Sequence, residues 1–174
     1  FTKFRGLELL LGCIAELPSD WSLVFMGWGP LEGEIKRAQS LASETRPNAI
    51  RMIGPAKQNE LPLWSSGAAV GVIPYEDHGI NHKYCTPNKL WEFPNAGVPV
   101  LVSPRVEMKK IVETHGIGLV YKEPASGRSI IDDINKIITS RELYSARCSE
   151  FLEHNSWSKY QCDIQNVYRS FGAL

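Results

Sequence analysis

Apolar residues follow two alternating patterns along the chain. The first pattern has helical spacing and predicts an amphipathic helix over residues 6–16, with apolar positions at Leu7, Leu10, Leu11, Ile14 and Leu17. Residues 21–29, WSLVFMGWG, then form a short continuous apolar run that ends in glycines. Such a run is typical of a strand that is buried on both faces of a sheet.

The same alternation continues towards the carboxyl end. Further strands are predicted over residues 49–54, 68–74, 98–103 and 116–121. Helices are predicted over residues 31–41, 60–67, 87–96, 106–115 and 130–138, and two more at about 141–154 and 156–171. Residues 75–86 are predicted to be a polar loop. This alternation predicts an α/β fold, a doubly wound (Rossmann-like) parallel sheet with helices on both faces. A leading strand is expected before the first helix, and no linker divides residues 1–174.

Composition narrows the class of protein. The chain is 43% hydrophobic and 22% charged, as globular proteins are. Lys plus Arg and Asp plus Glu are equal at 19 each, which argues against a nucleic-acid-binding surface. No apolar run is long enough to span a membrane, and no signal peptide is visible. The four cysteines are scattered and form no CxxC pair, which favours reduced thiols, a cytoplasmic location and no zinc site. Because the first residue is Phe1, we expect a piece of a longer protein.

In a doubly wound sheet, ligands bind outside the carboxyl ends of the strands. One loop at such an end, residues 27–33, contains Gly27 and Gly29 and so matches the start of the dinucleotide motif G-x-G-x-x-G. The third glycine is replaced by Glu32, so a tight strand-to-helix turn explains these glycines as well as a nucleotide does. A P-loop is excluded, because the chain has no GxxxxGK[ST].

The predicted helix over residues 87–96 carries a more specific signal. Thr86 is a favourable N-cap, and Pro87 suits the first helical position. Lys89 in the first turn opposes the helix dipole, at a cost of roughly 0.3–1 kcal/mol. A phosphate at this helix start would turn Lys89 into a counter-ion, and Glu92 could accept hydrogen bonds from ribose hydroxyls. The alternative is an exposed ion pair between Lys89 and Glu92.

Four segments of the chain resemble one known family, in order and at the usual spacings. They are residues 5–35, residues 53–75 (IGPAKQNELPLWSSGAAVGVIPY), residues 85–103 (CTPNKLWEFPNAGVPVLVS) and residues 115–121 (HGIGLVY). Together they resemble the carboxyl-terminal, donor-binding domain of retaining GT-B glycosyltransferases of group 1. The resemblance implies that residues 1–174 are one half of a GT-B fold and that the amino-terminal, acceptor-binding domain lies outside this chain. It also implies a nucleotide-sugar donor, for which we prefer a UDP-sugar, and no metal or other cofactor.

The resemblance also implies a set of donor-binding residues. The second Glu of the family's E-x7-E motif binds the donor ribose, and here it is Glu92. The first Glu is replaced by Tyr84, and a basic residue that meets the diphosphate falls at Arg5. The whole predicted nucleotide site comprises Arg5, Gly29, Pro55, Thr86, Asn88, Lys89, Leu90 and Glu92. Donor-sugar contacts are predicted for His78, Asn81 and Tyr84, and no catalytic residue is identified. Pro94 departs from the family pattern and should shorten or kink its helix.

The functional expectation is therefore sugar transfer, with retention, in polysaccharide or glycolipid assembly. The protein would be cytoplasmic and could meet the inner face of a membrane through the other domain. A non-catalytic nucleotide-binding or interaction module, and an epimerase of related architecture, are the alternatives. The last helix carries an aromatic stripe that is expected to pack in the core or on a second domain: Trp157, Tyr160, Ile164 and Tyr168.

Overall fold

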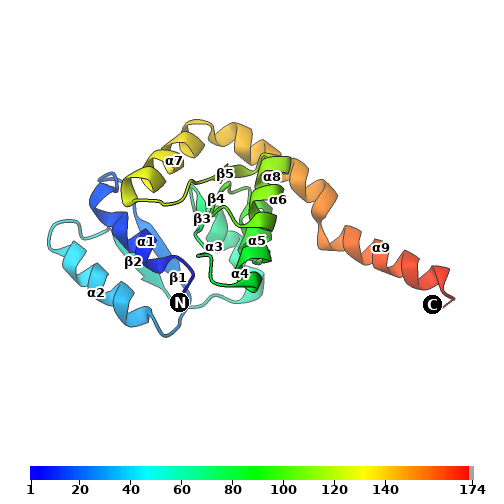
Figure 1. Ribbon diagram of the computed structural model, residues 1–174, viewed down its shortest axis with the longest axis horizontal. Coiled ribbons are helices and arrows are strands. Elements are labelled where there is room, and N and C mark those ends of the chain that lie inside the picture. Colours follow the sequence, from blue (N-terminus) through cyan, green and yellow to red (C-terminus); the bar gives the residue numbers. More distant parts are fainter. Residues whose placement is uncertain (173–174) are drawn as a thin grey trace.

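The computed structural model describes residues 1–172 (Figure 1). The strands are β1 (Leu23–Met26), β2 (Ile50–Ile53), β3 (Gly71–Ile73), β4 (Val100–Val102) and β5 (Gly118–Val120). The helices before β4 are α1 (Leu7–Gly12), α2 (Glu32–Ser43), α3 (Leu61–Ser66), α4 (Ile80–Tyr84) and α5 (Lys89–Asn95). Those after β4 are α6 (Val106–His115), α7 (Gly127–Thr139), α8 (Arg141–Asn155) and α9 (Trp157–Ser170). Short 3-10 turns occur at Ile14–Glu16 and Gln58–Glu60.

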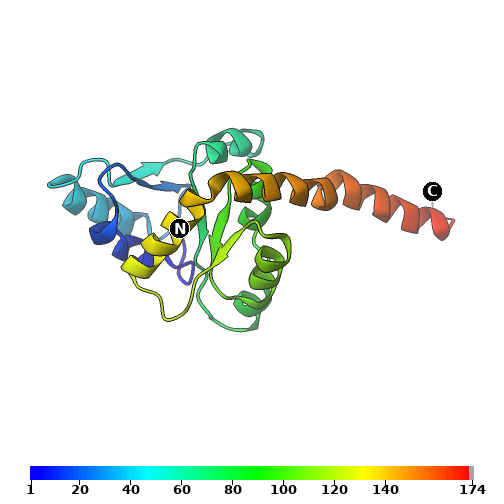
Figure 2. The same ribbon diagram turned by 90° about the horizontal axis from the view of Figure 1, so that it is seen from above.

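The paired strands are parallel, as predicted, but they form two sheet parts instead of one. β1 pairs with β2, and β3, β4 and β5 pair in that order. In the doubly wound strand order, the strand that precedes the first helix lies at the centre of the sheet. No ladder joins the two parts within residues 1–172, and the expected leading strand stays a prediction. Figure 2 shows the two parts side by side, with helices on both faces.

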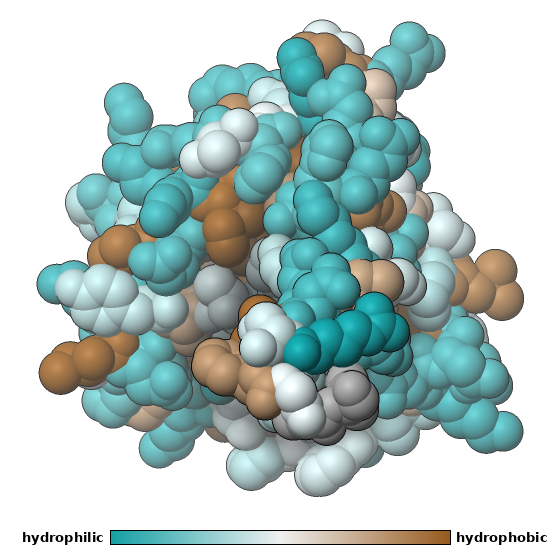
Figure 3. Space-filling model, turned by 90° about the vertical axis from the view of Figure 1, so that its right-hand side faces the viewer, coloured by the Kyte–Doolittle hydropathy of each residue, from teal (hydrophilic) through white to brown (hydrophobic). Residues whose placement is uncertain are grey.

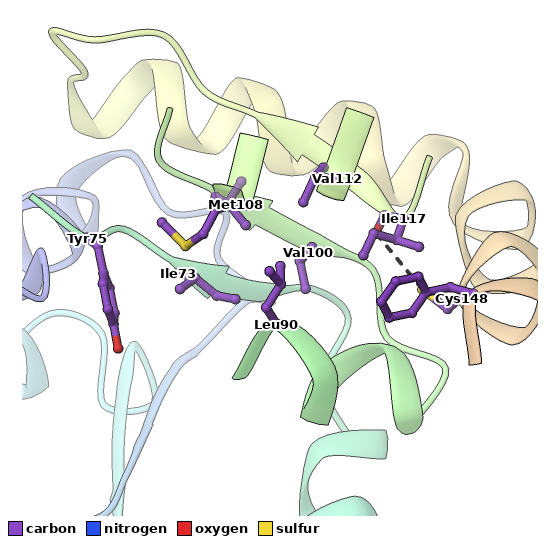
Figure 4. Packing of buried hydrophobic residues seen from close by; sticks show 10 residues of the cluster. Ile73, Tyr75, Leu90, Val100, Met108, Val112, Ile117 and Cys148 are labelled. Carbon is purple, nitrogen blue, oxygen red and sulfur yellow. Dashed lines mark hydrogen bonds between the residues drawn. The ribbon is translucent and has the colours of Figure 1, made fainter. Parts of the chain in front are cut away.

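The β3–β5 part has a core on each face. Side chains alternate along β4, so Val100 and Val102 join one core while Leu101 joins the other. The first core is covered by α5, α6 and α8, and Figure 4 shows Leu90 of α5 packed among its apolar side chains. The second core lies under α7, whose isoleucines Ile130, Ile134 and Ile137 are buried. A smaller third cluster stabilises β1 and β2: Leu7, Phe25, Ile35 and Ile50.

Helix α9 projects from the rest of the molecule in both ribbon views (Figures 1 and 2). Its aromatic stripe does not pack in the core as one expectation had it: Trp157 is 72% exposed and Tyr168 is 55% exposed. The physical reason is that α9 leaves α8 pointing away from both sheet parts. Figure 3 views the molecule from this side and shows scattered apolar side chains on a largely hydrophilic surface. Packing on a second domain stays a prediction.

The helices depart from the prediction at α1, α4 and α5. The first helix ends at Gly12 and continues only as a 3-10 turn. Within the predicted polar loop, Ile80–Tyr84 form α4, whose five residues are too few to show a period. Helix α5 begins at Lys89, with Asn88 as N-cap and no side-chain cap, so the predicted Thr86 cap is wrong. The helix is short, as Pro94 predicts, and ends at Asn95.

Candidate donor-binding site

Residues 1–6 lie across the carboxyl ends of both sheet parts. The carbonyl of Phe1 accepts a hydrogen bond from the Leu31 N–H at 3.1 Å, and the carbonyl of Phe4 accepts one from the Glu76 N–H at 3.2 Å. Gly6, the N-cap of α1, has a φ of +68°, and a Cβ there would lie 2.0 Å from the carbonyl oxygen of Pro74. Only glycine fits this position without strain. Gly6 therefore fixes the segment that carries Arg5 against the end of β3.

Tyr75 is the centre of the site. It follows β3, and in Figure 4 its ring points away from the other core side chains. The guanidinium carbon of Arg5 lies 4.0 Å from the centroid of this ring, within cation–π range. Burial raises the pKa of Tyr75, Arg5 opposes that shift, and Cys85 and Glu92 add to it. Arg5 therefore contacts the ring of Tyr75, and Glu92, far from Arg5 in sequence, acts on the same side chain through its charge.

Aromatic side chains extend the site beside Arg5. The Phe4 and His78 rings are stacked, with centroids 3.5 Å apart and an interplanar angle of 7°. The ring of His82 lies 6.0 Å from those of Tyr75 and His78, and its Nδ1 is buried without a partner among residues 1–172. Phe4 has a φ of +64°, a left-handed conformation that costs roughly 1–2 kcal/mol for a residue with a Cβ. Such strain often accompanies functional positions.

At the start of α5, Thr86, Asn88 and Lys89 are exposed, so they are free to meet a ligand. The side chain of Leu90 is fully buried, and its N–H donates to the carbonyl of Pro87 at 2.9 Å. The alternative interpretation of this helix does not hold in the part of the chain that is described: Lys89 and Glu92 form no ion pair there. Roles in donor binding stay predictions for all these residues.

The other predicted residues are more scattered. Gly29 follows β1, with a φ of +153°, and a Cβ there would lie 2.1 Å from the amino nitrogen of Phe1. Pro55 is exposed after β2, so both belong to the smaller sheet part and not to the Tyr75 cluster. Asn81 and Tyr84 are exposed on α4, in the segment between His78 and Cys85. Of the predicted residues, Arg5 and His78 therefore belong to the aromatic cluster most directly, through contacts with Tyr75 and Phe4.

Sequence reasoning missed four residues at this edge. Tyr75, Phe4 and His82 belong to the aromatic cluster. The available signal was an aromatic residue in each of two loops, Phe4 before the first predicted helix and Tyr75 at the start of the loop over residues 75–86. Arg105 precedes α6, and its buried side chain forms ion pairs with Asp77 at 3.3 Å and with Glu123. In the sequence, a single cation before a helix looks the same whether its side chain is buried or lies on the surface. Arg105 ties the loop that carries His78 to the loop after β5.

No group of three or more His, Cys, Asp or Glu side chains within residues 1–172 is arranged to hold a metal ion. No helix in the same range combines the length and the apolar character needed to cross a bilayer.

Comparison with known proteins identifies the family. A family model described as Glycosyl transferases group 1 matches residues 1–140. A search of curated proteins finds no match. Among solved structures, Alr3699/HepE from Anabaena, in complex with UDP and glucose, has a TM-score of 0.75 and 14% identity, covering 98% of this chain and 46% of that one. Sucrose-phosphate synthase from Thermosynechococcus elongatus has a TM-score of 0.74 and 20% identity, covering 99% and 43%.

A third similar structure is a single domain. The C-terminal domain of the glycosyl transferase group 1 family protein LpcC from Francisella tularensis has a TM-score of 0.69 and 18% identity, covering 89% of this chain and 81% of that one. This chain spans less than half of the two longer proteins. The doubly wound fold is thus confirmed as one half of a GT-B fold. The chain belongs to the group 1 glycosyl transferases, and it resembles their carboxyl-terminal domain.

Proposed function

We propose that this chain is the donor-binding domain of a retaining glycosyltransferase that takes a hexosyl group from a nucleotide sugar, with a UDP-sugar preferred. The observation that carries the proposal is the contact of the Arg5 guanidinium with the Tyr75 ring at the carboxyl edge of the β3–β5 sheet, where the charge of Glu92 also acts on Tyr75. That edge is where doubly wound sheets bind ligands. The Anabaena protein of similar fold was crystallised with UDP and glucose, which supports the choice of nucleotide.

Each residue has a chemical task in this proposal. Glu92 accepts hydrogen bonds from the ribose hydroxyls. Arg5 and Lys89 stabilise the negative charge that develops on the leaving diphosphate, a task that fixed cations perform in other enzymes without reorganisation. Because two cations serve this purpose, no metal is required. His78, with Asn81 and Tyr84 on α4, lies on the loop that would approach the donor sugar.

The acceptor would be held elsewhere. The chain spans 43 to 46% of the two longer proteins of similar fold, so we propose a second domain of the same enzyme that binds the acceptor. The two domains would enclose the reacting groups, and orientation in such a cleft supplies several kcal/mol of the barrier. We further propose a cytoplasmic role in polysaccharide or glycolipid assembly, with any membrane contact made by the second domain.

Titration calorimetry tests nucleotide binding. The 174-residue chain is titrated with UDP, GDP and ADP, in EDTA and then in Mg²⁺. We expect UDP to bind best and equally in both buffers. Binding that requires Mg²⁺ would contradict the metal-free proposal, and no binding of any nucleotide would contradict the donor-site proposal.

Two variants separate the ribose and phosphate tasks. Glu92→Gln should weaken uridine and UDP alike, by about ten- to a hundredfold, because a hydrogen bond to a charged group is lost. Arg5→Gln should weaken UDP but not uridine. Glu153→Gln, at an exposed position of α8, is the matched control and should change neither. Equal uridine affinity in Glu92→Gln and the parent would remove the ribose role.

Activity distinguishes an enzyme part from a non-catalytic module. The isolated chain should hydrolyse a UDP-sugar only at the background rate, and addition of the second domain should restore transfer. If UDP binds but no transfer follows in the presence of that domain, the non-catalytic alternative holds. Robust transfer by this chain alone would refute the two-domain arrangement.

A further inference from the structure

Arg105 is a buried cation at the carboxyl edge of the β3–β5 sheet, and the proposed donor contacts do not use it. Its side chain is only 4% exposed and forms ion pairs with Asp77, at 3.3 Å, and with Glu123. Two carboxylates therefore balance its single charge. Burial and pairing together make the guanidinium unavailable to a diphosphate, so Arg105 is not a third phosphate-binding cation beside Arg5 and Lys89.

The backbone at Arg105 is firmly fixed. Its N–H donates to the carbonyl of Ser103 at 2.7 Å. The helix that starts directly after it, α6, is anchored in the core by the buried side chains of Met108 and Val112. The side chain of its partner Asp77, by contrast, is 58% exposed and belongs to a loop. In this ion pair, the cation is therefore the fixed member and the carboxylate is the member that is held.

Asp77 lies in the middle of a tight turn over residues 76–78. The His78 N–H donates to the carbonyl of Glu76 at 3.0 Å and closes this turn. The ring of His78 stacks on that of Phe4, with centroids 3.5 Å apart. Because the 76–78 turn is so short, a displacement of its middle residue displaces both of its ends.

The 76–78 turn holds the chain on both sides of Arg5. The N–H of Glu76 donates to the carbonyl of Phe4 at 3.2 Å. The carboxylate of Glu76 accepts a hydrogen bond from the Gly6 N–H at 3.3 Å. Phe4 and Gly6 are the two neighbours of Arg5 in the sequence. The place of the Arg5 backbone therefore depends on where the turn lies.

Net stability does not explain a buried cation of this kind, because apolar residues of similar volume often stabilise a fold as well as a buried ion pair does. A buried ion pair can instead select one conformation. We propose that Arg105 is a positioning residue, which acts through Asp77 to fix the 76–78 turn. The turn in this place holds Arg5 against the ring of Tyr75, at 4.0 Å from its centroid. The inference rests on the proposed function only in taking a diphosphate as the ligand of Arg5.

Amide hydrogen exchange tests the hold on the turn without any ligand, by NMR on the isotope-labelled 174-residue chain. In Arg105→Met and in Asp77→Asn, the amide protons of Glu76 and Gly6 should exchange about three- to tenfold faster, because local opening of the turn becomes easier. The amide proton of Tyr121, which is hydrogen-bonded to β4, should keep its rate.

The matched control is Asp132→Asn on α7. This aspartate is also about half exposed, at 52%, and it pairs with Arg128 at 3.5 Å within a single helix. Because that pair ties no loop to another element, Asp132→Asn should leave the exchange of the Glu76 and Gly6 amide protons as in the parent.

Titration calorimetry with UDP and uridine tests the consequence for the donor site. Asp77→Asn should weaken UDP about three- to tenfold and leave uridine unchanged, because the link to the phosphate-binding Arg5 is lost. If Asp77 acted only through its charge, removing this carboxylate would strengthen the binding of an anion. Glu123→Gln keeps the link through Asp77 and should not weaken UDP. Adding Arg105→Met to Asp77→Asn should cause no further loss, since both changes break the same link.

Faster exchange of the Glu76 and Gly6 amide protons in both variants, with weaker UDP and unchanged uridine, sustains the proposal. Exchange rates equal to those of the parent, stronger UDP binding in Asp77→Asn, or additive losses in the double variant would overturn it. A parent chain that binds no nucleotide would refute the donor site instead, and the exchange rates would still decide whether Arg105 fixes the turn.

Discussion

Arg105 is a buried cation whose two partners are exposed to water. This difference in burial predicts how substitutions at the three positions change the stability of the fold. Its side chain is 4% exposed, whereas those of Asp77 and Glu123 are 58% and 42% exposed. Removing the cation and removing a partner should therefore have unequal effects. We expect Glu123→Gln to destabilise the fold clearly and Arg105→Met to change its stability little.

The magnitudes follow from what each variant leaves behind. In Glu123→Gln the guanidinium stays buried with Asp77 alone, at 3.3 Å. Breaking a buried pair in this way costs about 3–5 kcal/mol, which the exposure of Glu123 reduces to about 2 kcal/mol. In Arg105→Met no buried charge remains, both carboxylates are free to hydrate, and Met fills most of the space. The free energy of unfolding should then stay within about 1 kcal/mol of the parent value.

Urea unfolding at neutral pH, followed by tryptophan fluorescence, measures both variants. Glu113→Gln is the matched control, because its carboxylate is 57% exposed and its ion pair with Lys109 is 3.9 Å long. Such a surface pair contributes at most about 0.5 kcal/mol. If Arg105→Met loses more stability than Glu123→Gln, the reasoning is refuted, and the packing of the Arg105 stem dominates its charge.

Three further predictions concern the backbone, pH and the projecting helix. Gly6→Ala should cost about 2–4 kcal/mol of stability in urea, because of its positive φ and the Pro74 carbonyl 2.0 Å from the added Cβ. Gly33→Ala in α2, with no atom within 4 Å, should gain about 0.5–1 kcal/mol. Burial raises the pKa of Cys13 and Cys148 from 9.0 to about 11, so the folded state favours neutral thiols. The free energy of unfolding should be constant below pH 9 and fall as the pH rises towards 11. The fall should be less steep in the double variant Cys13→Ala/Cys148→Ala. A chain ending before α9 should keep the urea midpoint of the parent, since α9 has no buried residue; a clear loss would mean that α9 stabilises the domain.

The sequence predicted the strands well because each lies in a short, mostly apolar run of residues. Gly71–Ile73 and Val100–Val102 fall inside the predicted ranges 68–74 and 98–103. It failed where local signals were weak: Ile80–Tyr84 has a single apolar residue at its start and no capping side chain. Thr86 was a good cap by type, but the chain turns into the helix two residues later.

The candidate site was predictable in chemistry but only partly in geometry. Arg5 and Glu92 could be named from the resemblance. The structure places Arg5 in contact with Tyr75, and Glu92 acts on that side chain through its charge. Tyr75 itself was hidden, because an aromatic residue at a strand end is usually core. Arg105 was hidden for a different reason: burial of a cation depends on partners from distant loops, and a single sequence does not reveal such pairs.

The division of the sheet into two parts has a consequence for how the molecule opens. The β1–β2 part rests on a small cluster, and Val24 in β1 is 55% exposed. The β3–β5 part is enclosed by cores on both faces. Local opening is easiest where few apolar contacts must break. Amide protons of β1 and β2 should therefore exchange with deuterated solvent well before those of β4, so the domain would loosen from one side while the Tyr75 edge stays ordered.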